Sequence, residues 1–321
     1  MKLSEILYNN LKNKDPHFSF EILPPKKGAN IQKIYEAIEP LIEYEPININ
    51  VTYHQQEAVY KKHESGLLEK ITVRKRPGTV AISAAVKYKY RKPIVVPHLI
   101  CGGFSKEDTE NALIDLHFLG MKNMLVLRGD PPANQKYFIP EPDGHKNTLG
   151  LIKQIMNLNK GIYLDKDLHN TTATNFSIGI AGYPEKHHEA PNIHSDLKYL
   201  KMKVDAGAEY IVTQMFFETQ KYIDFVEMCR EEGITVPIVP GIKPIRNKRD
   251  FQLLPQVFSI DVPEELSCEI EKAEDNKAVY QIGIEWAIKQ SKELLKFGVP
   301  AVHYYTIGKS NNVRDIVKAV F

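Results

Sequence analysis

The chain has 321 residues, of which 43% are hydrophobic and 26% charged, as in an ordinary soluble globular protein. Lysine and arginine number 42 against 40 acidic residues, and this net charge of +2 does not favour nucleic acid or an anionic membrane surface as partner. The widely spaced Cys101, Cys229 and Cys268 indicate reduced thiols rather than disulfides. With no secretion signal and no long apolar run, we expect a cytoplasmic protein without membrane spans.

Short apolar runs alternate with longer amphipathic stretches along almost the whole chain. An N-terminal helix is expected over about residues 1–14. Eight later runs have the aromatic and β-branched content of strands, and they are 18–23, 47–53, 94–101, 123–129, 176–183, 210–217, 236–242 and 301–307. The stretches between them have helical patterns, such as 105–120 with its Ser cap and Gly stop. This alternation predicts a parallel (β/α)8 TIM barrel.

No repeat, low-complexity run or linker divides the sequence. We therefore predict a single domain over residues 1–321, with extra helical segments at about 131–148, 159–175 and 261–280. Because the chain ends soon after the eighth unit, no C-terminal regulatory domain is expected.

Polar residues stand at the C-terminal ends of all the predicted strands, where barrels of this kind carry their active sites. They are Glu21, Thr52 and Tyr53, His98, Arg128 and Asp130, Tyr183, Thr213 and Gln214, Lys243, and Tyr304 and Tyr305. Strand ends are also simply where apolar runs stop. The density of acidic, basic and amide side chains nevertheless favours an active site.

The segment HFSFEILPP at 17–25 carries one acidic residue, Glu21, inside an apolar run that two prolines end. Burial at this strand end would raise the pKa of the Glu21 carboxyl. A carboxyl that is protonated near neutral pH can act as a general acid. The alternative is a glutamate on the solvated face of an edge strand.

Two further segments carry candidate ligand contacts. In LRGDPP at 127–132 the arginine fits a phosphate or carbonyl, the glycine admits a ligand to the backbone, and the aspartate fits N–H donors; a plain turn is the alternative. In AGYPEKHHEAPNIHSD at 181–196 we predict no metal site, because adjacent histidines diverge in strands and helices and the order lacks a two-histidine i, i+4 pattern. Asp196 and Lys203 share one face of a predicted helix and either contact a cofactor or are solvated.

Lys243, in PGIKP, is a possible Schiff-base nucleophile if desolvated, and otherwise a phosphate contact or a solvated side chain. No Rossmann fingerprint and no Walker A sequence is present.

Taken together, the blocks FSFEILPPK, VTY, PHLIC, LRGDPP, AGYPEKHHEA, KVDAGAEYIVTQMFF, VPGIKPI and HYYTIGK resemble, in this order, the 5,10-methylenetetrahydrofolate reductases. The resemblance covers about residues 17–310. It implies a barrel that binds FAD and a ping-pong reaction with NADH or NADPH as co-substrate. In that reaction 5,10-methylenetetrahydrofolate becomes 5-methyltetrahydrofolate, which supplies methyl groups for methionine synthesis. It also implies a homo-oligomer.

Residue by residue, the resemblance implies that Glu21 is the general acid, whose proton assists opening of the folate's five-membered ring to the iminium that accepts hydride. Asp130 is implied as a second catalytic residue near flavin and pterin, and Gln214 as a substrate-orienting residue. The implied FAD contacts are Thr52, Tyr53, His98, Arg128, Gly129, Asp130, Tyr183, His187, Ala190, Asp196 and Lys203. Lys309 is implied to bind substrate where the family pattern has an arginine for the glutamate tail.

The sequence also departs from the family pattern. Tyr199 and Met202 stand where bacterial relatives often carry Asn and Arg, so we expect one flavin-phosphate contact fewer. His54 and Gln55 replace small residues after VTY.

Two other functions were weighed. They are a Schiff-base barrel lyase that uses Lys243 and a non-catalytic subunit that binds folate or flavin. Retention of Glu21 and Asp130 argues against both, because neither function needs this pair of carboxylates.

Overall fold

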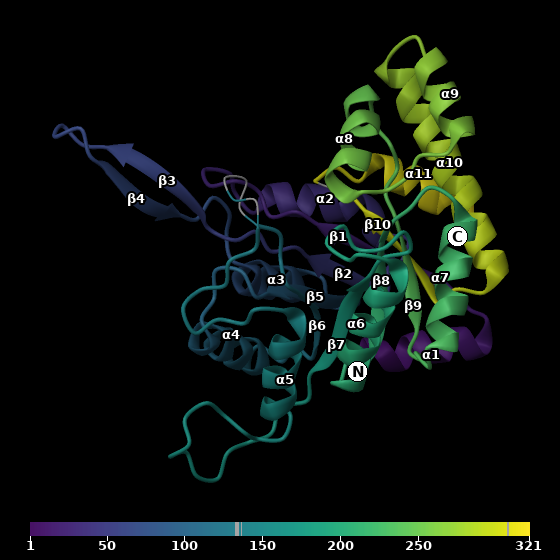
Figure 1. The fold of residues 1–321 in the computed structure, drawn as a ribbon. Coiled ribbons are helices and arrows are strands. Elements are labelled where there is room, and N and C mark those ends of the chain that lie inside the picture. The colour runs from purple at the N-terminus through teal and green to yellow at the C-terminus, as the bar shows by residue number, and fades with distance from the viewer. Residues whose placement is uncertain (132–134, 136, 307) are drawn as a thin grey trace.

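The computed structural model describes residues 1–131, 135, 137–306 and 308–321. Its central feature is a closed barrel of parallel strands in the order β1-β10-β9-β8-β7-β6-β5-β2 (Figure 1). The strands are β1 (His17–Ile22), β2 (Asn48–Val51), β5 (Ile94–Ile100), β6 (Asn123–Leu127), β7 (Ser177–Gly182), β8 (Tyr210–Met215), β9 (Ile238–Ile242) and β10 (Ala301–Tyr305). The predicted TIM barrel is therefore confirmed, and all the predicted strands are present.

Helices cover the outside of the barrel (Figure 1). They are α1 (Leu3–Asn13), α2 (Gln32–Ile42), α3 (Thr79–Lys89), α4 (Lys106–Phe118), α5 (Thr148–Leu158), α6 (Ile193–Asp205), α7 (Thr219–Glu231), α8 (Lys248–Phe258), α9 (Glu264–Lys272), α10 (Asn276–Phe297) and α11 (Asn311–Val320). Local sequence sets several starts. Ser105 and Asp108 form a capping box at α4, and the Asn192 side chain caps α6. None of the helices in the described residues is long and apolar enough to cross a membrane.

Strand β1 shows how the alternation of side chains builds two cores. Phe18, Phe20 and Ile22 are buried in the cluster between strands and helices. Ser19 and Glu21 take the other face, which points into the barrel. The apolar face of the strand thus packs against the helices, while its polar face lines the barrel interior.

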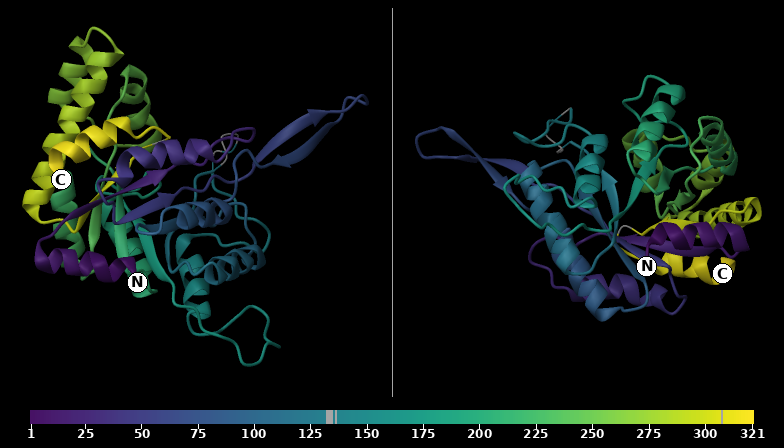
Figure 2. Two further views of the ribbon diagram at one scale, coloured as in Figure 1. Left: turned by 180° about the vertical axis from the view of Figure 1, so that it is seen from behind. Right: turned by 90° about the horizontal axis from the view of Figure 1, so that it is seen from below.

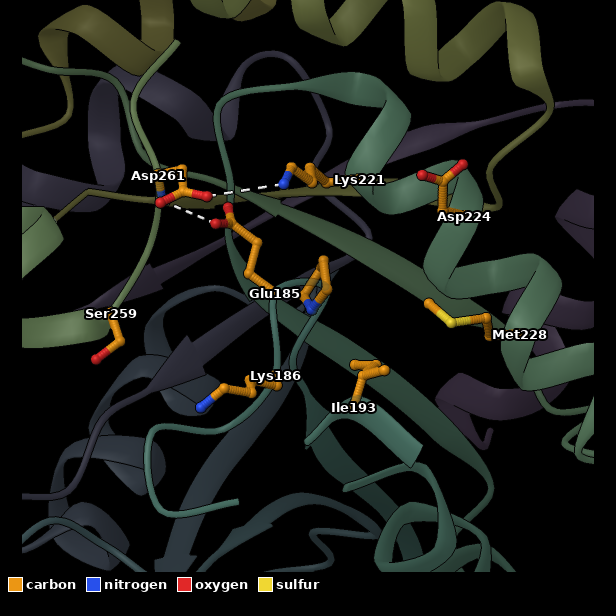
Figure 3. Close-up of a pocket in the computed structure, with 9 residues that line it drawn as sticks. Glu185, Lys186, Ile193, Lys221, Asp224, Met228, Ser259 and Asp261 are labelled. Atoms are coloured by element: carbon orange, nitrogen blue, oxygen red, sulfur yellow. Dashed lines mark hydrogen bonds and ion pairs between the residues drawn. The ribbon is translucent and has the colours of Figure 1, made fainter. Parts of the chain in front are cut away.

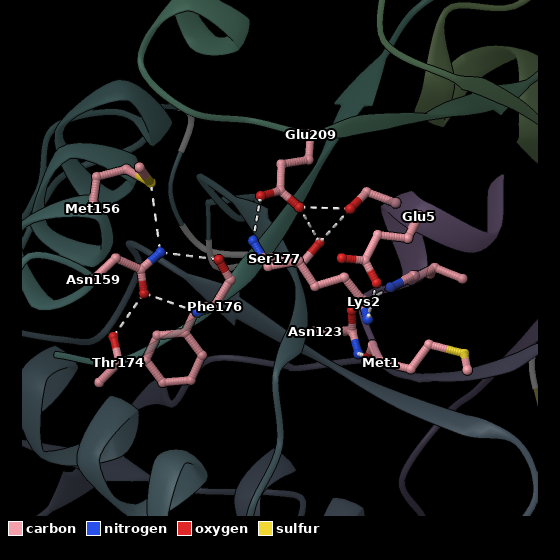
Figure 4. A network of polar contacts seen from close by, with 12 residues as sticks. Met1, Lys2, Glu5, Asn123, Met156, Asn159, Thr174, Phe176, Ser177 and Glu209 are labelled. Carbon is pink, nitrogen blue, oxygen red and sulfur yellow. Dashed lines mark hydrogen bonds and ion pairs between the residues drawn. The ribbon is translucent and has the colours of Figure 1, made fainter. Parts of the chain in front are cut away.

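Helix α1 closes the N-terminal end of the barrel. Leu3 and Leu7 are buried in a cluster with interior residues of the strands, namely Val96, Leu125, Tyr210, Val212, Val239 and Ala301. The Glu209 carboxylate accepts hydrogen bonds from Lys2 Nζ at 2.8 Å, from Ser4 Oγ at 2.7 Å and from Ser177 Oγ at 2.5 Å (Figure 4). Because this end is plugged, a ligand reaches the interior from the C-terminal ends of the strands.

The structure contains a hairpin that the sequence analysis did not predict. Strands β3 (Glu57–Lys62) and β4 (Leu68–Val73) form an antiparallel pair that projects away from the barrel (Figures 1 and 2). Its strands carry many charged residues and Val59, Tyr60 and Leu68 are exposed, so the apolar pattern that marks a buried strand is weak.

The three extra segments differ in structure. Residues 159–175 contain no helix or strand and form a long loop beyond α5, and the segment at 261–280 contains α9 and the start of α10. In the segment at 131–148, residues 132–134 and 136 lie outside the described residues, including Pro132 of LRGDPP.

Candidate active site

Four polar residues of the predicted set meet at the C-terminal mouth of the barrel. Glu21 of β1 pairs in register with Tyr305 of β10. Tyr304 pairs with Ile242 of β9, so Lys243, the next residue, lies level with Tyr305. Gln214 reaches the same mouth from β8. Because residues in register on parallel strands share a face, the Glu21 and Tyr305 side chains both face the interior.

The Glu21 carboxyl has the electrostatics of a protonated acid. Burial raises its pKa to about 8, and the positive charge of Lys243 limits the rise. The Glu21 backbone carbonyl accepts a hydrogen bond from Thr306 Oγ1 at 2.6 Å, which fixes the strand end. Within the described residues no group hydrogen-bonds to the Glu21 carboxyl, and its side chain is only partly buried. The acid is therefore available to a ligand in the mouth.

Tyr305 and Gln214 are held by hydrogen bonds to the backbone. The Tyr305 hydroxyl donates to the carbonyl of Thr213 at 2.5 Å, and burial raises its pKa, helped by Glu21 and Tyr183. Gln214 Oε1 accepts from the backbone N–H of Met215 at 3.0 Å. This leaves the NH2 group of Gln214 without a partner among the described residues, so it can donate to a ligand.

Arg128, at the end of β6, is held by a bidentate ion pair on the rim of the mouth. Its two terminal nitrogens donate to the Glu189 carboxylate at 2.5 and 3.0 Å, and this hydrogen bonding lowers the pKa of Glu189. The ring of Phe138 lies 5.1 Å from the guanidinium carbon. Gly129 follows with φ +85, and a Cβ there would lie 3.1 Å from Ile100 Cδ1, so the position requires glycine.

The segment after β7 folds into a turn rather than continuing as a strand. Tyr183 and His187 contact edge to face with ring centroids 4.7 Å apart, and the His187 and His188 rings stack at 4.4 Å. The expectation that the two histidines diverge was therefore wrong, because a turn brings adjacent side chains to one side. Burial lowers the pKa of His187 to about 4, so its imidazole is neutral near pH 7. The backbone N–H of Ala190 closes the turn by donating to the His187 carbonyl.

Helix α6 brings Asp196 and Lys203 to this turn. Asp196 Oδ2 accepts from the backbone N–H of His187 at 2.8 Å. Burial lowers the pKa of Lys203, while Asp196 acts in the opposite direction. The Lys203 ammonium has one long hydrogen bond, 3.5 Å to the Ala181 carbonyl. Tyr199 and Met202, in contrast, are exposed on the outside of α6.

The remaining predicted residues are more scattered. His98 is buried within β5, where its Nε2 accepts from Asn50 Nδ2 at 3.2 Å, and burial lowers its pKa to about 3. It therefore lies below the mouth and not at its rim. Thr52 Oγ1 donates to the Ile22 carbonyl at 3.2 Å. Tyr53 packs on Phe104.

Asp130 and Lys309 are both exposed at the mouth end of the barrel. The backbone carbonyl of Asp130 accepts a hydrogen bond from Gln55 Nε2 at 2.5 Å. Gln55, one of the departures after VTY, therefore fixes the backbone at Asp130 and leaves the carboxylate outside that contact.

A pocket of about 470 Å³ beside the turn was not predicted from the sequence (Figure 3). Its lining residues are Pro184, Glu185, Lys186, Ile193, Lys221, Asp224, Met228, Ser259 and Asp261. Glu185 Oε2 accepts from the Asp261 backbone N–H at 2.7 Å, and burial raises the pKa of Glu185 to about 7. Glu185 belongs to the AGYPEKHHEA block, but its contacts lie on distant segments, so only the fold brings this pocket together.

Comparison with known proteins matches the chain to one sequence family. The sequence family described as methylenetetrahydrofolate reductase matches residues 7–320. An Arabidopsis thaliana protein named methylenetetrahydrofolate reductase (NADH) 1 is 31% identical over 313 residues, which are 94% of this chain and 47% of that protein. The Salmonella typhimurium 5,10-methylenetetrahydrofolate reductase is 27% identical over 294 residues, 91% of this chain and 86% of that protein. The chain thus spans about half the length of the plant relative and most of the bacterial one.

Among solved structures, a Clostridium thermocellum protein described as binding two copies of 5-methyl-5,6,7,8-tetrahydrofolic acid superposes with a TM-score of 0.60. It is 15% identical and the match covers 98% of each chain. At this level of identity the similarity shows a shared fold.

Proposed function

The chain belongs to the methylenetetrahydrofolate reductase family, and on that premise we propose that it reduces 5,10-methylenetetrahydrofolate to 5-methyltetrahydrofolate. In this proposal FAD is the bound cofactor, NADH or NADPH is the electron donor, and the two substrates react in turn in a ping-pong cycle. The product would supply methyl groups for methionine synthesis. The observation that carries the proposal is Glu21, an acid with a raised pKa in the mouth of the barrel.

The residues on the rim fit FAD. Arg128, Lys186 and Lys203 supply positive charge to one side of the mouth, which suits a pyrophosphate. Within the part of the chain that the structure describes, the Lys203 ammonium has one hydrogen bond, the long contact to a carbonyl, so it can also donate to a phosphate oxygen. Gly129, with φ +85, gives the chain at this rim a backbone conformation that other residues rarely adopt. When bound, FAD supplies the hydride chemistry, which amino-acid side chains do not provide.

Glu21 would act as general acid on the folate. Near pH 7 its carboxyl is mostly protonated, and it would donate that proton to a nitrogen of the substrate's five-membered ring. The transfer opens the ring to the iminium that accepts hydride. The carboxylate that remains takes up a proton from water before the next cycle.

Gln214 and Asp130 would hold the substrate in the orientation that this proton transfer needs. The NH2 group of Gln214, which has no partner in the described residues, donates to the substrate, and the exposed Asp130 carboxylate accepts N–H groups from the pterin's amino-pyrimidine edge. Lys309 would contact the glutamate tail as a point charge, without the bidentate geometry of arginine.

The test is a visible absorption spectrum of the purified protein, followed by anaerobic addition of NADH and then of methylenetetrahydrofolate. We expect flavin bands that bleach with NADH and recover with the folate. A colourless protein that FAD does not reconstitute would refute the proposal. A bound flavin that NADH and NADPH both fail to bleach would refute the proposed electron donor.

The alternative of a Schiff-base lyase has one observation in its favour, since burial lowers the pKa of Lys243 to about 8. However, Lys243 is only 1% exposed, so a carbonyl substrate has no access to its amine. Trapping of a carbonyl substrate by borohydride would support the lyase, and we expect none.

A further inference from the structure

Lys243 is a fully buried lysine that the proposed reaction leaves without a role. It is 1% exposed and lies among apolar side chains that include Phe217, Leu266 and Trp286. Among the described residues its ammonium has one hydrogen bond, 3.5 Å to the carbonyl of Pro244. A buried charge with so little compensation is unfavourable unless an opposite charge lies nearby.

The strand register places an acid near it, Glu21, which becomes negatively charged when it loses its proton. Glu21 pairs with Tyr305, Tyr304 pairs with Ile242, and Lys243 comes directly after Ile242. Lys243 therefore lies level with Glu21, with only β10 between their strands. The structure describes both residues fully and shows no direct ion pair between them. The Lys243 charge nevertheless acts on the Glu21 carboxyl, and the Glu21 charge acts on Lys243.

Two other charged groups affect the pKa of Lys243 more than Glu21 does. Arg246 and Asp250 also act on Lys243, but they pair with each other at 2.9 Å, so their charges largely cancel there. On the side of Glu21 the titratable neighbours are Tyr305 and, beyond it, Tyr183. Burial raises the pKa of both phenols, so they are neutral near pH 7. The face of α10 beside Lys243 contributes Gly283, Trp286, Ala287 and Gln290, none of which titrates.

We propose that Lys243 is a positioning residue for the general acid: its ammonium, on a residue level with Glu21 and separated from it by β10, stabilises the carboxylate that remains after Glu21 has given up its proton. In this step the O–H bond of Glu21 breaks and an N–H bond forms on the folate ring. Below pH 8, where Lys243 is mostly protonated, its positive charge balances the negative charge left on Glu21. This inference rests on the proposed function, because it takes Glu21 as the acid.

The charge makes Glu21 a stronger acid than burial alone would allow. Without Lys243, the buried carboxyl would hold its proton more tightly and transfer it less readily. Lys243 thus keeps the proton affinity of Glu21 within the range in which it can both donate a proton and recover it from water.

The test compares the wild type with Lys243→Met, which keeps the length of the side chain and removes the charge. The reduced flavin is mixed with methylenetetrahydrofolate in single-turnover experiments from pH 6 to 10. We expect the alkaline limb of the rate profile to move up by about one pH unit and the plateau rate to fall about tenfold. Flavin reduction by NADH should be unchanged. Lys92→Met is the matched control, since Lys92 is exposed and pairs with Glu45.

A second measurement reads the carboxyl directly. The carboxylic-acid band of Glu21, identified by infrared difference against Glu21→Gln, is titrated in wild type and in Lys243→Met, with Lys243→Gln in reserve if the methionine variant does not fold. A band that persists to higher pH without Lys243 supports the inference, and identical titrations overturn it. Because this readout needs no folate turnover, it decides the role of Lys243 even if the proposed reductase activity fails.

Discussion

Replacing Glu21 by Gln should separate the two half-reactions and change the stability of the fold. Glutamine keeps the size of the side chain but has no proton to give. Transfer of hydride to the folate should therefore slow by about 10² to 10⁴, the usual contribution of a general acid. Reduction of the flavin by NADH does not use this proton, so its rate should stay within about a factor of two.

The stability effect follows from the raised pKa. The Glu21 carboxyl titrates near 8 in the folded protein against 4.5 in the unfolded chain. Between these values the folded state binds more protons than the unfolded state, so the free energy of unfolding falls as pH rises. At pH 7.5 this linkage costs the wild type at most about 4 kcal/mol. The variant Glu21→Gln, which has no group that titrates here, should gain at most this amount.

The assays are anaerobic stopped-flow kinetics of each half-reaction and urea unfolding at pH 5 and pH 8. We expect the two proteins to be similar at pH 5 and the variant to be more stable at pH 8. Glu36→Gln, at an exposed position of α2, is the matched control. Equal loss of both half-reactions would refute the role of Glu21, and parallel stability curves would refute its raised pKa.

Three further outcomes are expected. Glu189→Gln removes the carboxylate that competes for Arg128, so FAD should bind roughly fivefold more tightly in a fluorescence titration; weaker binding would mean that Glu189 instead orients the arginine. Glu209→Gln should lower the free energy of unfolding by about 1 to 3 kcal/mol at pH 7. Burial raises the pKa of Glu209, but its hydrogen bonds outweigh this and the net shift is downward. The difference should therefore decrease as pH falls below 4.5, and a difference that does not change with pH would contradict the account. Leu7→Ala should cost about 2 to 5 kcal/mol in urea unfolding, because it opens a cavity under the barrel, and a loss below 1 kcal/mol would show that α1 is not a plug.

The barrel itself could be predicted from local sequence. Each strand is a short apolar run that ends in polar residues, and helices with clear caps separate the runs. The alternation in β1, with Phe18, Phe20 and Ile22 on one face and Glu21 on the other, already indicates that the acid faces the interior. The sequence analysis missed the hairpin β3–β4, because strands that bury few side chains show little alternation of apolar and polar residues.

The amino-acid sequence by itself thus determined the order of the elements and placed Glu21, Arg128 and Asp130 at strand ends, because these depend on neighbours along the chain. Only the tertiary structure decided what those residues contact. The bidentate pair of Arg128 with Glu189, and the level placement of Lys243 with Glu21, join segments that are far apart in sequence. Burial and electrostatic coupling depend on such distant neighbours. The pKa of Glu21 is therefore set by the tertiary structure and not by the local sequence motif.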